Sequence, residues 1–263
     1  MVETWHYGLV ARWWGAFNEG GDDAEFFRRF VERTGGPALD VGCGAGRVLL
    51  PCIEAGLDVD GLDASADMLA ECQRLAGERG VSPTLHCQPM HEMRLERRYA
   101  SMFMCGAFGL GAGRREDLAT IARCFEHLAP GGVLAQDLYL PTNDKRTWAS
   151  WIEKPDMPRN WPKKSDRRAL PDGTDLDMQF RRTAFDPIAQ SWRGEIRIRH
   201  LDGDNLLADE VHSLTGMLYF TGEVVTMLEA TGFVDVEVRA GFEDRDPVPY
   251  EDHYLVITAS RPS

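Results

Sequence analysis

The chain has 263 residues, of which 43% are hydrophobic and 27% charged, and its formal net charge is −13. This length suits one large domain that carries an insertion, and it allows a proper hydrophobic core. The negative charge argues against nucleic acid and anionic membrane surfaces as partners, because both repel a field of the same sign.

Short apolar strands alternate with helical segments through the first half of the chain. This rhythm is typical of an α/β fold, in which helices cover both faces of a parallel, doubly wound sheet. The expected strands are 37–41, 57–62, 84–88, 100–104 and 133–140. The expected helices are 47–55, 65–79 and 115–128, the second capped by Ser65 and the third closed by Pro130-Gly131-Gly132.

The alternation stops after Pro141. Residues 142–176 are rich in Pro, Trp, Asp and Lys without a clear period, so we expect a loop or a partly ordered lid there. Three strand-like runs follow, and the middle one alternates in the manner of a half-buried antiparallel strand. These runs are 178–185, 190–200 and 205–218, and a helix at 223–231 with strands at 233–240 and 253–260 completes the chain.

The most informative run is Asp40-Val41-Gly42-Cys43-Gly44-Ala45-Gly46, which joins an expected strand to an expected helix. Glycine at alternate positions lets the backbone turn tightly and approach a ligand. Asp63 ends the next strand, at a distance along the chain that suits a contact with a ribose hydroxyl. A dinucleotide fingerprint would need glycine at position 47, where this chain has arginine. The pattern predicts a nucleoside cradle and disfavours a nicotinamide oxidoreductase.

With its D-x-G-x-G-x-G pattern and Asp63, the chain resembles the class I S-adenosylmethionine-dependent methyltransferases. The resemblance implies a Rossmann-like seven-stranded sheet, with an inserted antiparallel sheet that covers the active site. It also implies that Asp40, Gly42, Gly44 and Gly46 lie under the methionine and ribose parts of S-adenosylmethionine, and that Asp63 takes both ribose hydroxyls.

The layout of the chain is similar to that of bacterial small-molecule N- and O-methyltransferases, which include amino-sugar N-methyltransferases. This similarity implies that the chain has three structural units. Residues 1–34 form a helical lid, residues 35–141 with 220–263 bind the cofactor, and residues 142–219 cover the substrate.

The resemblance also places residues at the adenine end of the cofactor. Ala64 follows the ribose carboxylate, and Met68 is expected against the adenine face. The adenine edge is usually held by an acidic residue just after the third strand, but this chain has Gln88-Pro89-Met90 there. Either Gln88 or the backbone at Met90 is expected to make this contact.

At the methionine end, Cys43 and Cys105 are expected to line the site through their backbones. The N-terminal arm supplies Tyr7 or Trp14 as an aromatic side chain near the sulfonium. Arg12 is expected to bind the methionine carboxylate. No metal site is expected.

Methyl transfer from a sulfonium is an in-line displacement that depends mainly on orientation, so the sequence identifies a base less well than the cofactor. The candidate bases are His212, Asp137 and Tyr139, of which the last two end the fifth strand.

The covering segments are rich in tryptophan, and residues 142–200 carry 13 basic and nine acidic side chains. A small acceptor, aromatic or anionic, is therefore expected, with Phe108, Trp192 and His200 around it. Two alternatives stay open, a non-catalytic module that binds the cofactor and a methyltransferase of proteins or peptides.

No apolar run reaches the roughly 18–20 residues of a membrane span. The first 17 residues contain Glu3 and lack an apolar stretch. We therefore expect a cytoplasmic protein without a signal peptide.

Overall fold

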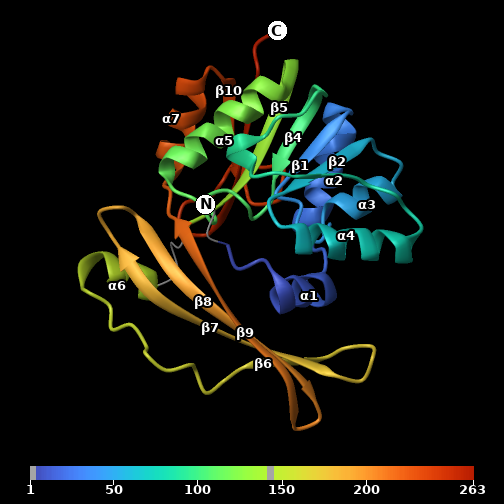
Figure 1. Ribbon diagram of the computed structural model, residues 1–263. Helices are drawn as coiled ribbons and strands as arrows, with labels where there is room; N and C mark the ends of the chain where they lie inside the picture. Colours follow the sequence, from blue (N-terminus) through green and yellow to red (C-terminus); the bar gives the residue numbers. More distant parts are fainter. Residues whose placement is uncertain (1–3, 141–144) are drawn as a thin grey trace.

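The computed structural model describes residues 4–140 and 145–263, which form two β-sheets (Figure 1). The strand order is β10-β11-β5-β4-β1-β2-β3 in the first sheet and β6-β7-β8-β9 in the second. Helix α1 (Gly8–Phe17) lies between the two sheets, as Figure 1 shows.

The first sheet is the α/β sheet that the sequence predicts. Its strands are parallel except that β11 runs antiparallel to both β5 and β10. Strand β1 is buried along its whole length, as expected for a strand covered on both faces. The strands are β1 (Ala38–Val41), β2 (Val59–Asp63), β3 (Thr84–Cys87), β4 (Tyr99–Met104), β5 (Leu128–Tyr139), β10 (Val234–Ala240) and β11 (Tyr254–Ser260).

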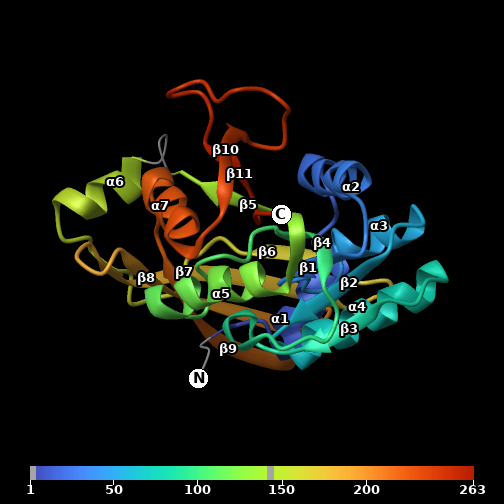
Figure 2. The ribbon, with the colours of Figure 1, turned by 90° about the horizontal axis from the view of Figure 1, so that it is seen from above.

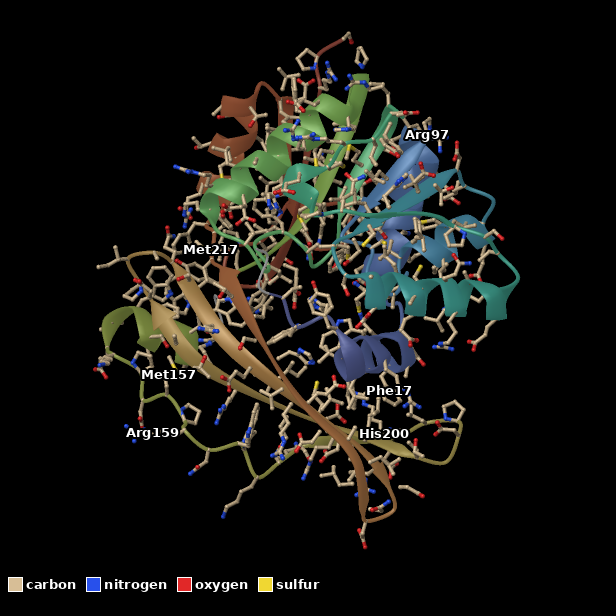
Figure 3. The ribbon with its side chains drawn as sticks, viewed as in Figure 1. Phe17, Arg97, Met157, Arg159, His200 and Met217 are labelled. Carbon is tan, nitrogen blue, oxygen red and sulfur yellow. The ribbon has the colours of Figure 1, made fainter. Side chains whose placement is uncertain are left out.

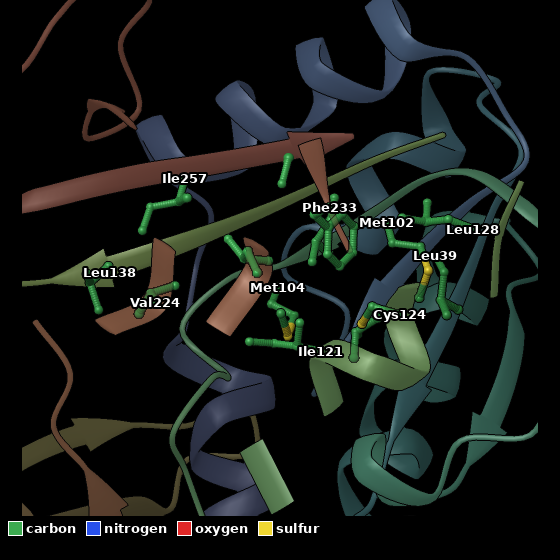
Figure 4. Close-up of a cluster of buried hydrophobic side chains, with 14 of the residues drawn as sticks. Leu39, Met102, Met104, Ile121, Cys124, Leu128, Leu138, Val224, Phe233 and Ile257 are labelled. Atoms are coloured by element: carbon green, nitrogen blue, oxygen red, sulfur yellow. The ribbon is translucent and has the colours of Figure 1, made fainter. Parts of the chain in front are cut away.

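Helices cover both faces of this sheet, and Figure 2 shows α2 and α3 on one side with α5 and α7 on the other. On the first side Phe27 stacks on Phe103, with ring centroids 5.2 Å apart. On the second side Ile121 and Cys124 of α5 pack with Leu39 and Met102 (Figure 4). The helices are α2 (Asp22–Thr34), α3 (Leu49–Glu54), α4 (Ala66–Arg79), the short η1 (Met90–Glu92), α5 (Arg114–His127), α6 (Lys145–Ile152) and α7 (Thr221–Thr231).

The second sheet packs one face against α1. Trp13 of α1 belongs to the same buried cluster as Ile196 and Ile198 of the sheet. Gly216 makes room for this packing, because a Cβ atom there would lie 2.4 Å from the ring of Trp192. The strands are β6 (Asp166–Ala169), β7 (Asp175–Asp186), β8 (Ser191–Asp202) and β9 (Asn205–Met217).

The structure differs from the expected elements in three places. Residues 142–176, expected to lack regular structure, contain α6 and β6, while residues 141–144 lie outside the described part of the chain. Strand β5 begins at Leu128, because Tyr99 pairs with Leu128 across a register shift. Helix α7 begins at Thr221 itself, and Phe220 takes the N-cap position with its N–H donating to Glu223 Oε2.

Candidate active site

The glycine loop between β1 and α3 forms the floor of the site. The amides of Gly42 and Cys43 both donate to the carbonyl of Leu62, so the loop is fixed against the end of β2. Gly42 has φ +85°, and a Cβ atom there would lie 2.5 Å from the Cβ of Ala107. At Gly44, with φ +54°, a Cβ atom would lie 2.9 Å from the terminal methyl carbon of Met68. Both glycines therefore keep space open above the loop.

Asp63 ends β2 directly beside this loop. Its two carboxylate oxygens accept hydrogen bonds from different backbone amides, Oδ2 from Gly44 at 2.9 Å and Oδ1 from Ser65 at 2.8 Å. Burial nevertheless raises the pKa of Asp63 above its usual value, against the opposing effect of these amides. The carboxylate is thus held rigidly between the glycine loop and the start of α4.

A cavity of about 300 Å³ lies above the loop. Most of the expected cofactor residues line it, namely Trp14, Asp40, Gly42, Cys43, Gly44, Asp63, Ala64, Met68, Met90 and Cys105. Gly46 does not line it, because its Cα faces α4 and a Cβ atom there would lie 2.6 Å from Cys72 Sγ. Further lining residues that the sequence did not single out are Thr4, His6, Asn18, Arg47, Ala107, Asp117 and Thr120.

Arg47 lines the cavity, and the expected Arg12 does not. Arg47 pairs with Asp23 of α2 and donates to Cys105 Sγ at 3.3 Å. Arg12 points to the second sheet, where it donates to Asp172 Oδ2 at 2.9 Å and does not line the cavity. Arg47 directly follows Gly46, the third glycine of the motif. This position next to the motif could have identified Arg47 as a cavity residue from the sequence.

Apolar side chains that line the cavity include Met68, near Gly44, and Met90 and Ala107, near Gly42. Gln88 does not contribute, because its amide is engaged with the backbone of Arg94, accepting from the Arg94 N–H at 2.8 Å. Of the two expected adenine contacts, only the residue at Met90 therefore faces the cavity.

The N-terminal arm closes the cavity with His6 and Trp14, whose rings meet edge to face at 5.8 Å. His6 Nε2 accepts a hydrogen bond from Trp5 Nε1, and burial lowers the pKa of His6 to about 4, so the ring is neutral at neutral pH. Tyr7 lies outside the cavity lining. Partial burial raises its pKa, and the charges of Asp63 and Asp67 add to this effect.

Two of the candidate bases, Asp137 and Tyr139, lie two residues apart on β5, and the third, His212, lies on β9. Asp137 accepts a hydrogen bond from the N–H of Gly106, a cavity residue, at 2.7 Å. Tyr139 is 44% exposed and packs on Tyr254, with ring centroids 5.0 Å apart. His212 contacts Glu210 at 3.1 Å beside the first turn of α1.

Burial changes the acidity of Asp137. It raises the pKa of Asp137 to about 6, and the hydrogen bond from Gly106 opposes the shift without cancelling it. A carboxyl group with this pKa is ionised at neutral pH and accepts a proton readily near it.

The residues expected around the acceptor are not gathered at the cavity. Phe108 belongs to the loop that follows β4, and its ring packs on Tyr219 with centroids 5.1 Å apart. Trp192 packs on Trp5 within the cluster under the second sheet. His200 lies near the far end of that sheet, below α1, and contacts Thr174 (Figure 3).

Within residues 4–140 and 145–263, no group of three or more His, Cys, Asp or Glu side chains is placed to hold a metal ion. None of the helices in this part of the chain combines the length and apolar character that crossing a membrane requires.

Comparison with known proteins agrees with this geometry. Residues 38–132 match a family model described as a methyltransferase domain. The dTDP-3-amino-3,6-dideoxy-alpha-D-glucopyranose N,N-dimethyltransferase of Streptomyces fradiae is 33% identical over 127 residues, which are 48% of each chain. A dTDP-3-amino-3,4,6-trideoxy-alpha-D-glucopyranose N,N-dimethyltransferase of Streptomyces venezuelae is 32% identical over 114 residues, 43% of this chain and 46% of that one. The matches span about half the length of these curated relatives.

Solved structures share the fold over nearly the whole chain. A sugar N-methyltransferase from a Streptoalloteichus species superposes with a TM-score of 0.67 and 20% identity, covering 100% of this chain and 94% of that one. An S-adenosylmethionine-dependent methyltransferase from Clostridium acetobutylicum gives 0.68 with 14% identity, covering 92% of each chain.

Proposed function

We propose that this chain, which belongs to the class I S-adenosylmethionine-dependent methyltransferases, transfers a methyl group to the amine of a small sugar substrate. The acceptor class that we favour is an amino sugar carried on a nucleoside diphosphate, because both curated relatives are named for dTDP-linked amino sugars. Such an acceptor is small and anionic.

The observation that carries the proposal is the set of groups that line one cavity. Arg47 supplies a cation, Asp63 a fixed carboxylate, and Met68 and Met90 apolar surface. S-adenosylmethionine offers a partner to each, with an amino-acid carboxylate, a ribose diol and a flat base. Side chains at Gly42 or Gly44 would occupy the space between them, so the residues present fit this cofactor.

S-adenosylmethionine, when bound, supplies a methyl group on a positively charged sulfur. Asp63 would accept hydrogen bonds from the ribose hydroxyls, and Arg47 would pair with the methionine carboxylate. Trp14 and His6 would cover the cavity from the N-terminal arm and exclude water. We propose that α1 acts as a lid and the second sheet as the cover of the acceptor.

Asp137 is the proton acceptor that we favour for the incoming amine. A protonated amine has no free lone pair, so it must lose a proton before it attacks the methyl carbon. Asp137 stands behind Gly106 at the end of β5, ionised at neutral pH and held by a backbone amide. His212 contacts Glu210, which accepts a hydrogen bond from the backbone of α1. Tyr139 lies further along β5 than Asp137.

The test is turnover of dTDP-3-amino-3,6-dideoxyglucose with S-adenosylmethionine, followed by mass spectrometry of the sugar nucleotide. We expect product with one or two added methyl groups, matched by S-adenosylhomocysteine. Cofactor binding without methylation of this or other amino sugars would contradict the proposal and favour a binding module. Methylation of peptides in place of sugars would favour the protein methyltransferase alternative.

A further inference from the structure

A second pocket, of about 560 Å³, lies at the edge of the second sheet. It is lined by α6, by residues of the segment 153–162 that follows this helix, and by β7. The pairing of β6 with β7 spans Asp175–Met178, and the pocket borders the edge of β7 just beyond it. Successive side chains of a strand point to opposite faces, so Phe180 and Arg181 reach the pocket from the two faces of β7.

Arg181 is a fixed cation on the wall of this pocket. Its Nε and Nη2 atoms donate to Glu195 Oε2 of β8, at 2.8 and 2.6 Å, and its Nη1 atom donates to the carbonyl of Arg159, which is labelled in Figure 3. Its guanidinium also lies 4.3 Å from the ring centre of Trp161. A guanidinium has five N–H donors, so these three bonds to described residues leave two for a ligand. A planar cation held in this way is suited to phosphate oxygens.

Phe180 supplies an aromatic ring next to this cation. Its side chain lines the pocket and is 43% exposed, so the ring is open to contact with a ligand. Gly194 of β8 leaves room for the ring, because a Cβ atom there would lie 2.6 Å from it. An open aromatic ring beside a phosphate-binding cation is suited to a nucleoside diphosphate, since the base can stack on the ring while the phosphates meet the guanidinium.

The charge around the pocket favours an anion. Three cations and two carboxylates line it, namely Lys154, Arg181, Arg182, Glu153 and Asp156. The pocket lies in the part of the chain at 142–200, which has 13 basic and nine acidic side chains, although the whole chain has a net charge of −13. A basic region on an acidic protein attracts an anionic ligand locally.

The second pocket lies close to the cofactor cavity. The ring of Phe180 lies 5.8 Å from that of Trp5, and the ring of Trp5 lies 6.2 Å from that of His6, which lines the cavity. The cavity itself, with about 300 Å³, is near the lower end of the usual range for small-molecule sites. The nucleotide of a second ligand therefore needs a place beside this cavity, and the second pocket offers one.

We propose that the second pocket binds the nucleoside diphosphate part of the acceptor, with Arg181 on the phosphates and the ring of Phe180 against the base. This inference rests on the proposed function, because the sugar amine of such an acceptor has to reach the cofactor in the neighbouring cavity. It assigns recognition of the acceptor to β7 and to the segment that follows α6.

The test is a calorimetric titration of dTDP into the full chain saturated with S-adenosylhomocysteine. We expect dTDP to bind at least about fivefold more tightly than inorganic pyrophosphate, since the base adds a stacking contact. It should inhibit methyl transfer in competition with the amino-sugar nucleotide and not with S-adenosylmethionine. Arg181→Gln should weaken dTDP binding about tenfold or more, because hydrogen bonds from a charged group to phosphate are lost, and should leave the affinity for S-adenosylhomocysteine unchanged.

Arg197→Gln is the matched control. Arg197 of β8 also pairs with a carboxylate of the neighbouring strand, Asp209, and its guanidinium lies 6.0 Å from the ring centre of Trp161, but it does not line the pocket. This variant loses contacts of the same kind and should keep the wild-type affinity for dTDP. Phe180→Leu tests the base separately, because it keeps an apolar side chain and should reduce only the preference for dTDP over pyrophosphate.

The outcomes separate this inference from the proposed function. A wild type that methylates the amino-sugar nucleotide but does not bind dTDP would overturn the inference and leave the proposed function standing. Equal affinities for dTDP in the wild type and a folded Arg181→Gln protein would also overturn it, as would equal losses in the Arg181 and Arg197 variants. If dTDP binds as expected but no amino sugar is methylated, the nucleotide site is supported and the proposed function has failed.

Discussion

Four aspartates of the cavity region show how one residue type takes different properties from its surroundings. Asp40 is buried beneath the glycine loop, and desolvation raises its pKa to about 8. Asp63 is fixed by backbone amides on both oxygens. Asp117 and Asp137 each have a pKa of about 6, chiefly because of burial. Burial raises the pKa of all four carboxyl groups, and backbone amides oppose this shift at Asp63, Asp117 and Asp137.

The pKa of Asp137 predicts the pH dependence of the rate. Burial raises this pKa above that of an exposed aspartate, so the basic form is lost as the pH falls through about 6. We expect kcat to rise with pH through about 6 and to level off above it. Asp137→Asn should remove this step and lower the plateau roughly 100-fold.

The measurement is kcat at saturating cofactor and acceptor between about pH 5 and 8. A step near pH 6 that persists in Asp137→Asn would exclude this carboxylate as the base.

At the residue scale, the sequence predicted the positions of those residues that a particular backbone conformation fixes. Gly42, Gly44 and Asp63 lie where the motif predicts, since the turn and the strand end fix them in relation to each other. The positions of long side chains could not be predicted in the same way. Arg12 and Arg47 are equally cationic in sequence, and only tertiary packing turns the first to Asp172 and the second to the cavity.

At the scale of the element, α1 is held at its N-terminus by two carboxylates from different parts of the chain. The N–H of Gly8 donates to Asp67 of α4 at 2.7 Å, and the N–H of Leu9 donates to Glu210 of β9 at 2.8 Å. Its own N-cap residue, Tyr7, makes no side-chain hydrogen bond. These carboxylates take the place of a cap and join α1 to α4 and to the second sheet.

We expect Glu210→Ala to lower the stability of α1 by about 1 kcal/mol, the usual loss when a helix cap is removed. Hydrogen exchange of the α1 amides and the dissociation rate of S-adenosylhomocysteine should both increase. Glu237→Ala is the control, because Glu237 is an exposed carboxylate on β10 that pairs with Arg239. Unchanged exchange in α1 of the Glu210 variant would show that Glu210 does not hold this helix.

Elements with a clear apolar period were predictable, and elements formed by pairing alone were not. The alternation along β8 gives Ile196 and Ile198 to the core, as expected. Strand β6 has no such signal, because it is an edge strand of mainly charged residues that forms by pairing with β7. Its Arg167 pairs with Asp175 of the neighbouring strand, a contact that the sequence alone does not reveal.

At the scale of the molecule, the loops of the first sheet and the N-terminal arm together enclose the cavity. The loops at the ends of β1, β2, β3 and β4 form its floor and walls, and the N-terminal arm forms its cover. The resemblance stated from the motif predicted this fold class correctly, because a parallel sheet places its ligand site at the ends of its strands. The expected placement of Trp192 and His200 around the acceptor stays a prediction, since both belong to the second sheet and neither lines the cavity.

The most direct test of the central claim is a calorimetric titration of the full chain with S-adenosylmethionine and S-adenosylhomocysteine, with NADH as the control ligand. Gly42→Ala and Gly56→Ala form a matched pair for this titration. Both glycines have positive φ, +85° and +79°, but a Cβ atom at Gly42 would enter the cavity wall, while at Gly56 it meets nothing within 4 Å.

The account predicts micromolar binding of both adenosyl ligands to the wild type and to Gly56→Ala, at least about tenfold weaker binding to Gly42→Ala, and no binding of NADH. Binding of NADH, or equal affinities in the two glycine variants, would contradict the assignment of this cavity to S-adenosylmethionine.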